Sequence, residues 1–226
     1  MPPRLAKDKE RNAARSRAAI LDAAERLFAE RGYDAASLTE VGAAAGVSRG
    51  TPGYFFGSKA ELYRAVLDRA FTEVREAVRA GRARALASSQ APEAILAGAV
   101  SDYFEFLAAR PNFIRLIERE ALSGTPQLEG ADHISAGQEA LAAISAELGL
   151  DEAESGDAAQ LLLSVIALCW FPLIHARTVA PAVGVELHDA ADLERRKRHV
   201  VDLVLHGVRG LTAPTTATLA EAPPHD

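Results

Sequence analysis

Apolar residues recur every three or four positions along most of this chain, which is the spacing of one face of an α-helix. The stretch from Ile20 to Phe28 shows this spacing clearly, and Gly32 follows it as a stop signal. The pattern predicts a first helix over about residues 10–31. β-Branched runs bounded by turn residues, which would indicate strands, are scarce.

Two short helices around a glycine turn are predicted next. Ser37 and Glu40 have the spacing of a capping box, which opens a helix over "LTEVGAAA". Gly46 can adopt the positive φ of a tight turn, so this helix is expected to end there. Ser48 is then expected to cap a third short helix.

The remaining chain is also predicted to be helical, apart from its end. Helices are expected over about residues 59–85, 92–110, 111–122, 127–148, 158–179 and 190–211. The longest apolar run, Leu161 to Ile174, is interrupted by Pro172 and is too short for a membrane span, so it predicts a buried helix and no membrane protein. Residues 213–226, rich in Thr, Pro and Ala, are expected to be a disordered tail.

Composition supports an all-α protein kept in a reducing compartment. Apolar residues make up 49% of the 226, but aromatic residues only 6%. A single cysteine cannot form an intramolecular disulfide, and the basic N-terminus lacks the apolar core of a secretory signal. Both observations predict a cytoplasmic protein.

The net charge of −6 is unevenly distributed. Residues 1–59 contain ten Lys/Arg and seven Asp/Glu, a net +3, whereas the remainder contains 15 basic and 24 acidic residues, a net −9. A basic head on an acidic body suits a protein that touches a polyanion with one end.

Residues 37–56 have the layout of a helix-turn-helix. Over a longer stretch, "ILDAAERLFAERGYDAAS", "VGAAAGVSRGT" and "SKAELYRAVL" occur in order between Arg17 and Leu67, and this stretch resembles the N-terminal domain of the TetR family of bacterial transcriptional regulators. The resemblance implies an N-terminal three-helix DNA-binding domain (1–59, with a basic arm), joined by a long helix to a C-terminal helical effector-binding and dimerisation domain (60–212).

The resemblance also implies the DNA-contacting residues. These are Thr39, Ser48, Arg49, Gly50, Thr51, Gly53, Tyr54 and Lys59. Arg49 is the candidate for reading a guanine in the major groove, and Ser48, Tyr54 and Lys59 for contacting phosphates. The basic arm (Arg4, Lys7, Lys9, Arg11) either reaches the minor groove or is a solvated tail.

Pro52 and Gly53 depart from the family pattern, which usually has a leucine and an aromatic residue there. A proline deep in a helix costs about 3 kcal/mol, but in the first turn its missing N–H matters far less. Re-capping at Thr51 would therefore leave a short recognition helix. Gly53 lacks the aromatic hydroxyl that often contacts a phosphate in this family.

For the C-terminal domain, the resemblance implies an effector pocket and a dimer interface. The aromatic clusters predict a largely apolar effector bound by Tyr103, Phe104, Leu107, Phe113, Ile117, Trp170, Phe171 and Ile174. The stripe expected to pair two subunits is Leu193, Val200, Val204, Val208 and Leu211. A monomeric core could use the same stripe.

Enzymatic functions are not supported by the sequence. Cys169 lies in a nearly all-apolar run, the histidines lack metal-ligand spacing, and no Gly-rich phosphate loop occurs. We therefore expect no cofactor and no metal. The leading hypothesis is a ligand-responsive homodimeric repressor that binds a palindromic DNA operator. The alternative is a helical ligand-binding or protein-interaction module that no longer reads DNA.

Overall fold

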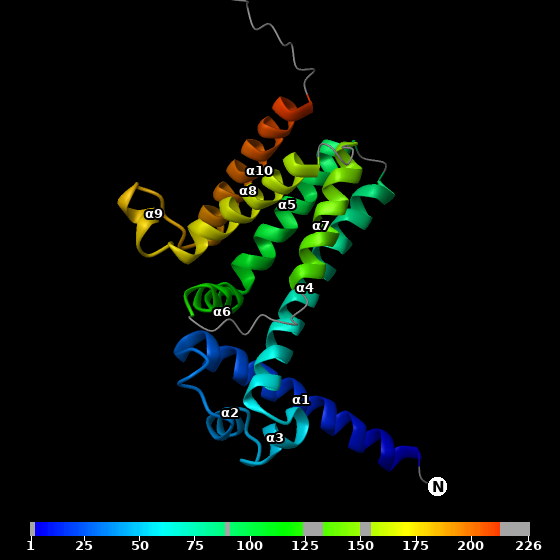
Figure 1. Ribbon diagram of the computed structural model, residues 1–226, viewed down its shortest axis with the longest axis vertical. Coiled ribbons are helices and arrows are strands. Elements are labelled where there is room, and N and C mark those ends of the chain that lie inside the picture. The colour runs from blue at the N-terminus through cyan, green and yellow to red at the C-terminus, as the bar shows by residue number, and fades with distance from the viewer. Residues whose placement is uncertain (1–2, 89–90, 124–132, 150–154, 213–226) are drawn as a thin grey trace, which may run out of the picture.

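The computed structural model describes residues 3–88, 91–123, 133–149 and 155–212, and within these ranges every regular element is a helix (Figure 1). The all-α prediction is confirmed. The helices are α1 (Pro3–Arg31), α2 (Leu38–Ala44), α3 (Thr51–Phe56), α4 (Lys59–Ala87), α5 (Pro92–Ala109), α6 (Pro111–Leu122), α7 (His133–Leu148), α8 (Ser155–Ile174), α9 (Val179–Ala182) and α10 (Ala190–Thr212).

The predicted helix boundaries differ from the structure in two places. α1 begins at Pro3 instead of about Glu10, so the basic arm is a continuation of the helix and not a separate coil. The expected helix 158–179 ends at Ile174, and α9 forms a separate turn after it. The predicted disordered tail, 213–226, lies outside the described residues.

The N-terminal unit is built on α1 to α3 and the first half of α4. Its core contains Ile20 and Phe28 of α1, Val41 of α2, and Leu62 and Val66 of α4. The core therefore continues past residue 59, where the sequence placed the domain boundary. α4 runs on from this unit into the upper part of the molecule, as Figure 1 shows.

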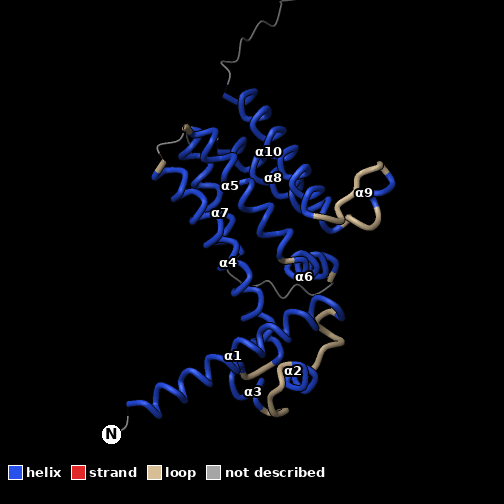
Figure 2. The backbone as a smooth tube through the Cα atoms, turned by 180° about the vertical axis from the view of Figure 1, so that it is seen from behind, coloured by secondary structure: helices blue, strands red, loops and turns tan. Residues whose placement is uncertain are grey.

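The C-terminal unit is a bundle of α5, α7, α8 and α10 with α4 from Ala70 onward. Its core includes Ala70 of α4, Phe104 of α5, Ile144 of α7, Val165 of α8 and Val204 of α10. Figure 2 shows α8 and α10 side by side, and α6 lies between this bundle and α1. α6 packs on α1, α5 and α8.

Pro172 lies inside the last turn of α8 without ending it. Because proline has no N–H, the carbonyl of Leu168, four residues earlier, loses its helical partner. Arg196 of α10 donates a hydrogen bond to that carbonyl at 3.3 Å. The side chain from α10 thus replaces the bond that Pro172 removes.

α4 and α5 approach closely at Gly81. A Cβ atom at this position would lie 1.6 Å from Oδ2 and 2.7 Å from Cγ of Asp102, which is paired with Arg84 at 2.9 Å. We expect Gly81→Ala to lower the free energy of unfolding by about 1–3 kcal/mol through this overlap, despite the better helix propensity of alanine. Urea unfolding measures the change.

Gly98 of α5 provides the matched control, because nothing lies within 4 Å of a Cβ built there. Gly98→Ala should be neutral or stabilising by up to about 1 kcal/mol. A Gly81→Ala protein as stable as Gly98→Ala would show that the two helices separate at no cost.

Candidate nucleic-acid interface and internal cavity

α2, a turn over residues 45–50 and α3 form a helix-turn-helix at one end of the molecule (Figure 1). Ser37 accepts a hydrogen bond from the N–H of Glu40, and the Glu40 carboxylate accepts one from the N–H of Ser37 at 3.0 Å, so the predicted capping box is present. Hydrogen bonding to Ser37 lowers the pKa of Glu40. Gly46 has φ +68°, which turns the chain toward α3.

Pro52 faces the inside of the domain. It occupies the first turn of α3, is fully buried, and would lie 3.4 Å from a Cβ at Gly42 of α2. The recognition helix therefore starts at Thr51 with Gly50 as its N-cap. The expected cap at Ser48 was wrong, since the Ser48 hydroxyl instead bonds the Thr51 hydroxyl at 2.7 Å.

Several predicted DNA-contacting residues are exposed at this end of the protein. Ser48, Arg49 and Thr39 are exposed, and the exposed fraction of Tyr54 is 85%. Among the described residues, the Arg49 guanidinium has no ion-pair or hydrogen-bond partner. Thr51 and Gly53 are half-buried, and Gly50 is exposed. An exposed arginine beside short hydroxyl side chains can donate hydrogen bonds to base edges and phosphates.

Lys59 does not match its predicted role as a phosphate contact. Its ammonium donates hydrogen bonds to the carbonyls of Tyr33, Asp34 and Ala36 at 3.0, 3.3 and 3.2 Å. It also lies 4.3 Å from the centre of the Tyr33 ring. All three N–H groups are thus occupied inside the domain, where they fix the loop between α1 and α2 to the start of α4.

α6 joins the N-terminal unit to the bundle through polar contacts. Arg119 donates hydrogen bonds to the carbonyls of Ala29 and Glu30 at 2.9 and 2.7 Å, and so caps the C-terminal end of α1. The buried carboxylate of Glu120 accepts a hydrogen bond from the Tyr63 hydroxyl of α4 at 2.6 Å. Burial and this carboxylate raise the pKa of Tyr63.

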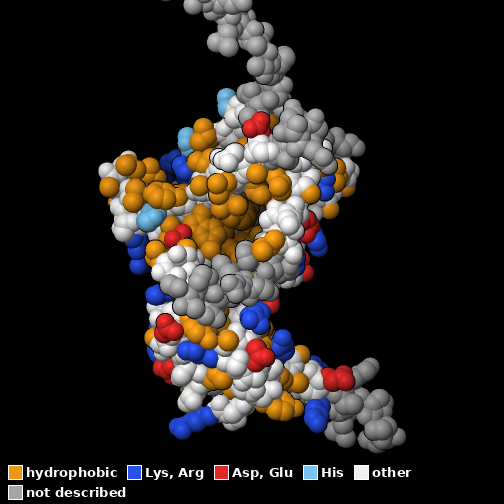
Figure 3. Space-filling model, viewed as in Figure 1, with side chains coloured by type: hydrophobic (Ala, Val, Ile, Leu, Met, Phe, Trp, Pro, Cys, Tyr) orange, Lys and Arg blue, Asp and Glu red, His pale blue; other side chains and the backbone are white. Residues whose placement is uncertain are grey.

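The same turn of α6 reaches an internal cavity of about 250 Å³ in the bundle. Ile117 lines the cavity, and Glu118 accepts a hydrogen bond at 2.6 Å from the indole N–H of Trp170, another lining residue. Figure 3 shows the opening as a hollow lined by apolar side chains on one face of the bundle. Consecutive residues of α6 therefore contact the cavity, α1 and α4.

Half of the predicted pocket residues line this cavity. Tyr103, Phe113, Ile117 and Trp170 do so. The other four do not: Phe104 and Leu107 are core residues, Ile174 packs against the core, and Phe171 has 50% of its surface exposed. Helical position decides the difference, since Tyr103 and Phe104 are neighbours on α5 and point about 100° apart around the helix axis.

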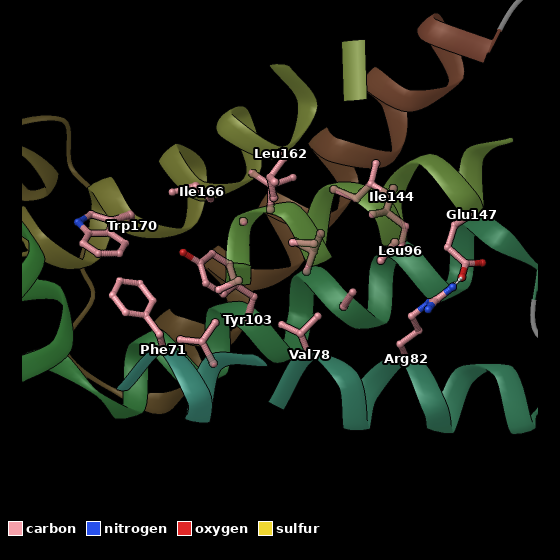
Figure 4. Close-up of a pocket in the computed structure, with 18 of the residues that line it drawn as sticks. Phe71, Val78, Arg82, Leu96, Tyr103, Ile144, Glu147, Leu162, Ile166 and Trp170 are labelled. Carbon is pink, nitrogen blue, oxygen red and sulfur yellow. Dashed lines mark hydrogen bonds and ion pairs between the residues drawn. The ribbon is translucent and has the colours of Figure 1, made fainter. Parts of the chain in front are cut away.

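The walls that α4 and α7 contribute were not predicted from the sequence. These are Phe71, Val74, Val78 and Arg82 of α4, and Ala136, Gly137, Ala140, Ala143, Ile144 and Glu147 of α7. The row of small residues in α7 was the available signal, because small side chains leave space beside a helix. Figure 4 shows the side chains of several helices converging on this space.

The predicted dimer stripe is the inner face of α10. Val200, Val204 and Val208 are buried within a single chain, and Leu193 packs against the same core. The interpretation as a dimer interface was wrong for the three valines, because the chain's own bundle covers them, whereas Leu193 is only half-buried. The side chain of Leu211 lies outside the described part.

Comparison with known families identifies both units. The model described as bacterial regulatory proteins, tetR family, matches residues 20–66. A second model, described as a tetracyclin repressor-like C-terminal domain, matches residues 92–204, which is half of the chain. The chain belongs to the TetR family. The first match contains the helix-turn-helix, and the second contains most of the cavity.

Individual TetR-family relatives match parts of the chain. The HTH-type transcriptional activator FasR of Mycolicibacterium smegmatis is 35% identical over 112 residues, 50% of this chain and 49% of FasR. The HTH-type transcriptional repressor BepR of Brucella suis is 43% identical over 58 residues, 26% of this chain and 28% of BepR. The matches thus span half or less of these relatives, which are transcriptional regulators and not enzymes.

A solved structure shares the fold along most of the chain. The fatty acid degradation regulator FadR from Bacillus halodurans has a TM-score of 0.64 and 20% identity, over 84% of this chain and 97% of that one. At this identity the likeness concerns the fold. It extends the TetR-family architecture from the helix-turn-helix into the C-terminal bundle.

α8 is also long and apolar enough to cross a membrane, with a mean hydropathy of 1.8 over Gly156–Ile174. In this TetR-family fold, Leu161 and Cys169 of α8 are buried against the bundle, and Trp170 is hydrogen-bonded to α6. These contacts hold one face of α8 against the bundle and the cavity, while 28% of the apolar window is buried within the single chain.

One group of possible metal ligands occurs among the described residues. The ligand atoms of Glu186, His188 and Asp192 lie within 4.8 Å of one another near the start of α10. The Asp192 carboxylate already accepts hydrogen bonds from the N–H of His188 and from Arg195, which lower its pKa. This arrangement caps the helix, and its members are mostly exposed.

A buried thiol and a half-buried phenol are expected to make the stability of this chain sensitive to alkaline pH. Burial raises the pKa of Cys169 to about 12, and burial with the nearby thiol raises the pKa of Tyr103. The folded state therefore holds these protons more tightly than the unfolded state. Their contribution to stability is complete below the pKa of the unfolded thiol and is lost as the pH rises through the interval up to about 12.

We expect the free energy of unfolding to fall above about pH 8.5, with Cys169 contributing up to about 1.4 kcal/mol per pH unit. Urea unfolding between pH 7 and 10.5 measures the slope. In Cys169→Ala the free energy of unfolding should fall less steeply with pH, by up to about 1.4 kcal/mol per pH unit, because one titrating proton is removed. An identical slope in the variant would mean that the thiol ionises as easily in the folded protein as in the unfolded one.

Proposed function

We propose that this TetR-family chain is a cytoplasmic homodimeric repressor that binds a palindromic DNA operator and releases it when a small, largely apolar effector occupies the cavity. The observation that carries the proposal is the exposure of side chains at the end of the helix-turn-helix. Arg49, Ser48 and Tyr54 are exposed there, and Arg49 has no partner among the described residues. The burial of Pro52 supports the proposal, because the departure from the family pattern points away from the DNA-facing side.

A second copy of the chain is the expected partner, and a surface on α8 and α10 suits it. Leu163 and Phe171 of α8 have 60% and 50% of their surface exposed, and Leu203 of α10 has 47%. Ala167 and Gly207 are also exposed and would let helices approach closely. We call these five residues the α8–α10 face. Two copies paired through it would form a four-helix contact with two-fold symmetry, which matches a palindromic operator.

The cavity suits an apolar effector and adjoins the elements that hold the DNA-binding unit. Phe71 and Arg82 of α4 line it, and α4 continues down to the recognition helix. α6 lines it through Ile117 and caps α1 through Arg119. An effector that fits one arrangement of α4 and α6 better than the other shifts the distance between the two recognition helices of a dimer.

Selection of binding sites from sheared genomic DNA of the source organism tests the proposal. We expect enrichment of a palindrome whose half-sites are about one helical turn apart, 34–36 Å. Affinity for it should fall steeply with salt, with a log–log slope of about −0.9 per phosphate neutralised. A stable dimer that enriches no sequence, with and without effector, would support the alternative of a ligand-binding module that does not read DNA.

The sign of regulation needs a separate measurement, because relatives are named as both activator and repressor. A reporter gene with the selected operator overlapping its promoter should be silent in the presence of the protein. Increased expression instead would make the protein an activator and leave the DNA-binding proposal intact.

A further inference from the structure

The cavity has a charged end and an aromatic end. Among the described residues that line it, the charged ones are Arg82 of α4 and Glu147 of α7, and the rest are apolar or small except for the hydroxyl of Tyr103. Figure 4 shows Arg82 and Glu147 together at one end of the cavity, with Phe71 and Trp170 at the other. Phe71 and Arg82 are eleven positions apart on α4, so the cavity extends roughly 16 Å along that helix.

The two charges neutralise each other inside the cavity wall. Nε of Arg82 donates to Oε1 of Glu147 at 2.8 Å, and Nη2 lies 2.5 Å from the same oxygen. Both nitrogens converge on one carboxylate oxygen. Nη1 of Arg82 and Oε2 of Glu147 therefore remain without a hydrogen-bond partner among the described residues. The pair presents no net charge, but Nη1 can still donate hydrogen bonds and Oε2 can still accept them.

A charged ligand meets a penalty at this pair. A carboxylate that takes Arg82 leaves Glu147 as an uncompensated anion with only 13% of its side chain exposed, and an ammonium that takes Glu147 displaces Arg82, which has 37% exposed. Removing one partner from a partly buried ion pair costs more than forming the new contact regains. An uncharged hydroxyl or amide can accept a hydrogen bond from the guanidinium, or donate one to the carboxylate, without breaking the pair.

We propose that the cavity selects an elongated, uncharged amphiphile, with an apolar body against the aromatic end and a hydroxyl or primary amide head at the Arg82–Glu147 pair. The pair acts as a filter that rejects carboxylates and amines of the same length. This inference rests on the proposed function of the cavity as the effector site and adds the chemical class of the effector.

Trp170 is the single tryptophan of the chain and lines the cavity, so its fluorescence reports binding without any DNA. The protein is titrated at pH 7 with decanol, decanamide, decanoate and decylamine, which share a chain and differ in the head. We expect the two neutral ligands to bind at least about tenfold more tightly than either charged one. Equal or tighter binding of a charged ligand overturns the proposal.

Reciprocal substitutions give the sharper test. Glu147→Gln frees Arg82 and should strengthen decanoate binding by about tenfold or more, with no gain for decylamine. Arg82→Gln should strengthen decylamine binding and not decanoate binding. The double variant restores a neutral pair and should again prefer the neutral ligands, which also controls for damage to the bundle.

The outcomes separate this proposal from the one it rests on. If all four ligands bind the wild-type protein with similar affinity, or if the single variants do not exchange their charge preference, the filter is overturned and the effector cavity stands. If none of the ligands binds any of the proteins while each keeps its native stability, the effector cavity is overturned together with the filter.

Discussion

Replacing Arg49 by alanine is expected to weaken operator binding by about 100-fold while leaving the dimer and the stability of the fold unchanged. A good arginine contact to a guanine gives about 1–3 kcal/mol of discrimination, roughly tenfold or more per half-site, and a dimer makes the contact twice. Stability should not change, because Arg49 is exposed and has no partner among the described residues. Fluorescence anisotropy with the selected operator measures the affinity.

Arg49→Lys separates base reading from phosphate binding. Lysine keeps the charge but lacks the planar fork, so it should retain the salt slope and lose discrimination between the operator and a site with the guanine replaced. If Arg49 contacts only phosphate, Arg49→Ala should instead reduce the salt slope by about 0.9 per lost contact and weaken all sequences alike. Unchanged affinity in Arg49→Ala would place DNA recognition elsewhere on the protein.

The helical fold could be predicted from the sequence because its signals are local. The spacing of apolar residues and the capping box of Ser37 and Glu40 require only neighbours a turn apart, and both predict elements that the structure contains. Helix ends set by tertiary contacts were harder. The sequence predicts one helix over 158–179, but α8 ends at Ile174, two residues after Pro172, where Arg196 of α10 bonds the carbonyl that the proline leaves free.

The candidate site was less predictable, because a motif does not show which of its side chains already form hydrogen bonds within the fold. Lys59 stands where the family places a phosphate contact, yet the carbonyls of Tyr33, Asp34 and Ala36 occupy it. The cavity was hard to predict for a similar reason. Its α4 and α7 walls come together only through packing, and the Arg82–Glu147 pair joins residues far apart in the chain.

The α10 stripe shows that periodicity finds an apolar face but not what covers it. Val200, Val204 and Val208 have the spacing of an interface, and the bundle of the same chain buries them. The surface that we propose for a second subunit is the neighbouring one, the α8–α10 face, where Ala167 and Leu203 are exposed. A mixed row of small and large apolar residues, which on α8 lies in a run that is apolar nearly all round, gives a weaker sequence signal than a regular valine stripe.

Charging this face should therefore dissociate the dimer. In a protein with Ala167→Glu and Leu203→Glu, like charges meet across the two-fold axis and apolar contact is lost, so we expect a monomer at concentrations where the wild-type protein is a dimer. Each monomer then binds one half-site alone, and operator affinity should fall by about 100-fold or more, because the second half-site no longer binds at a high effective concentration. Sedimentation velocity and anisotropy measure the two effects.

The same two charges placed elsewhere distinguish loss of pairing from loss of folding. Ala80 of α4 and Ala94 of α5 are exposed helical positions outside the α8–α10 face, so Ala80→Glu with Ala94→Glu should keep both the dimer and the operator affinity. Because Ala167 and Leu203 are themselves exposed in the single chain, the charged face should leave the helical content and the urea midpoint of the monomer close to those of the control. A dimer that persists with glutamates at both positions would move the interface away from α8 and α10.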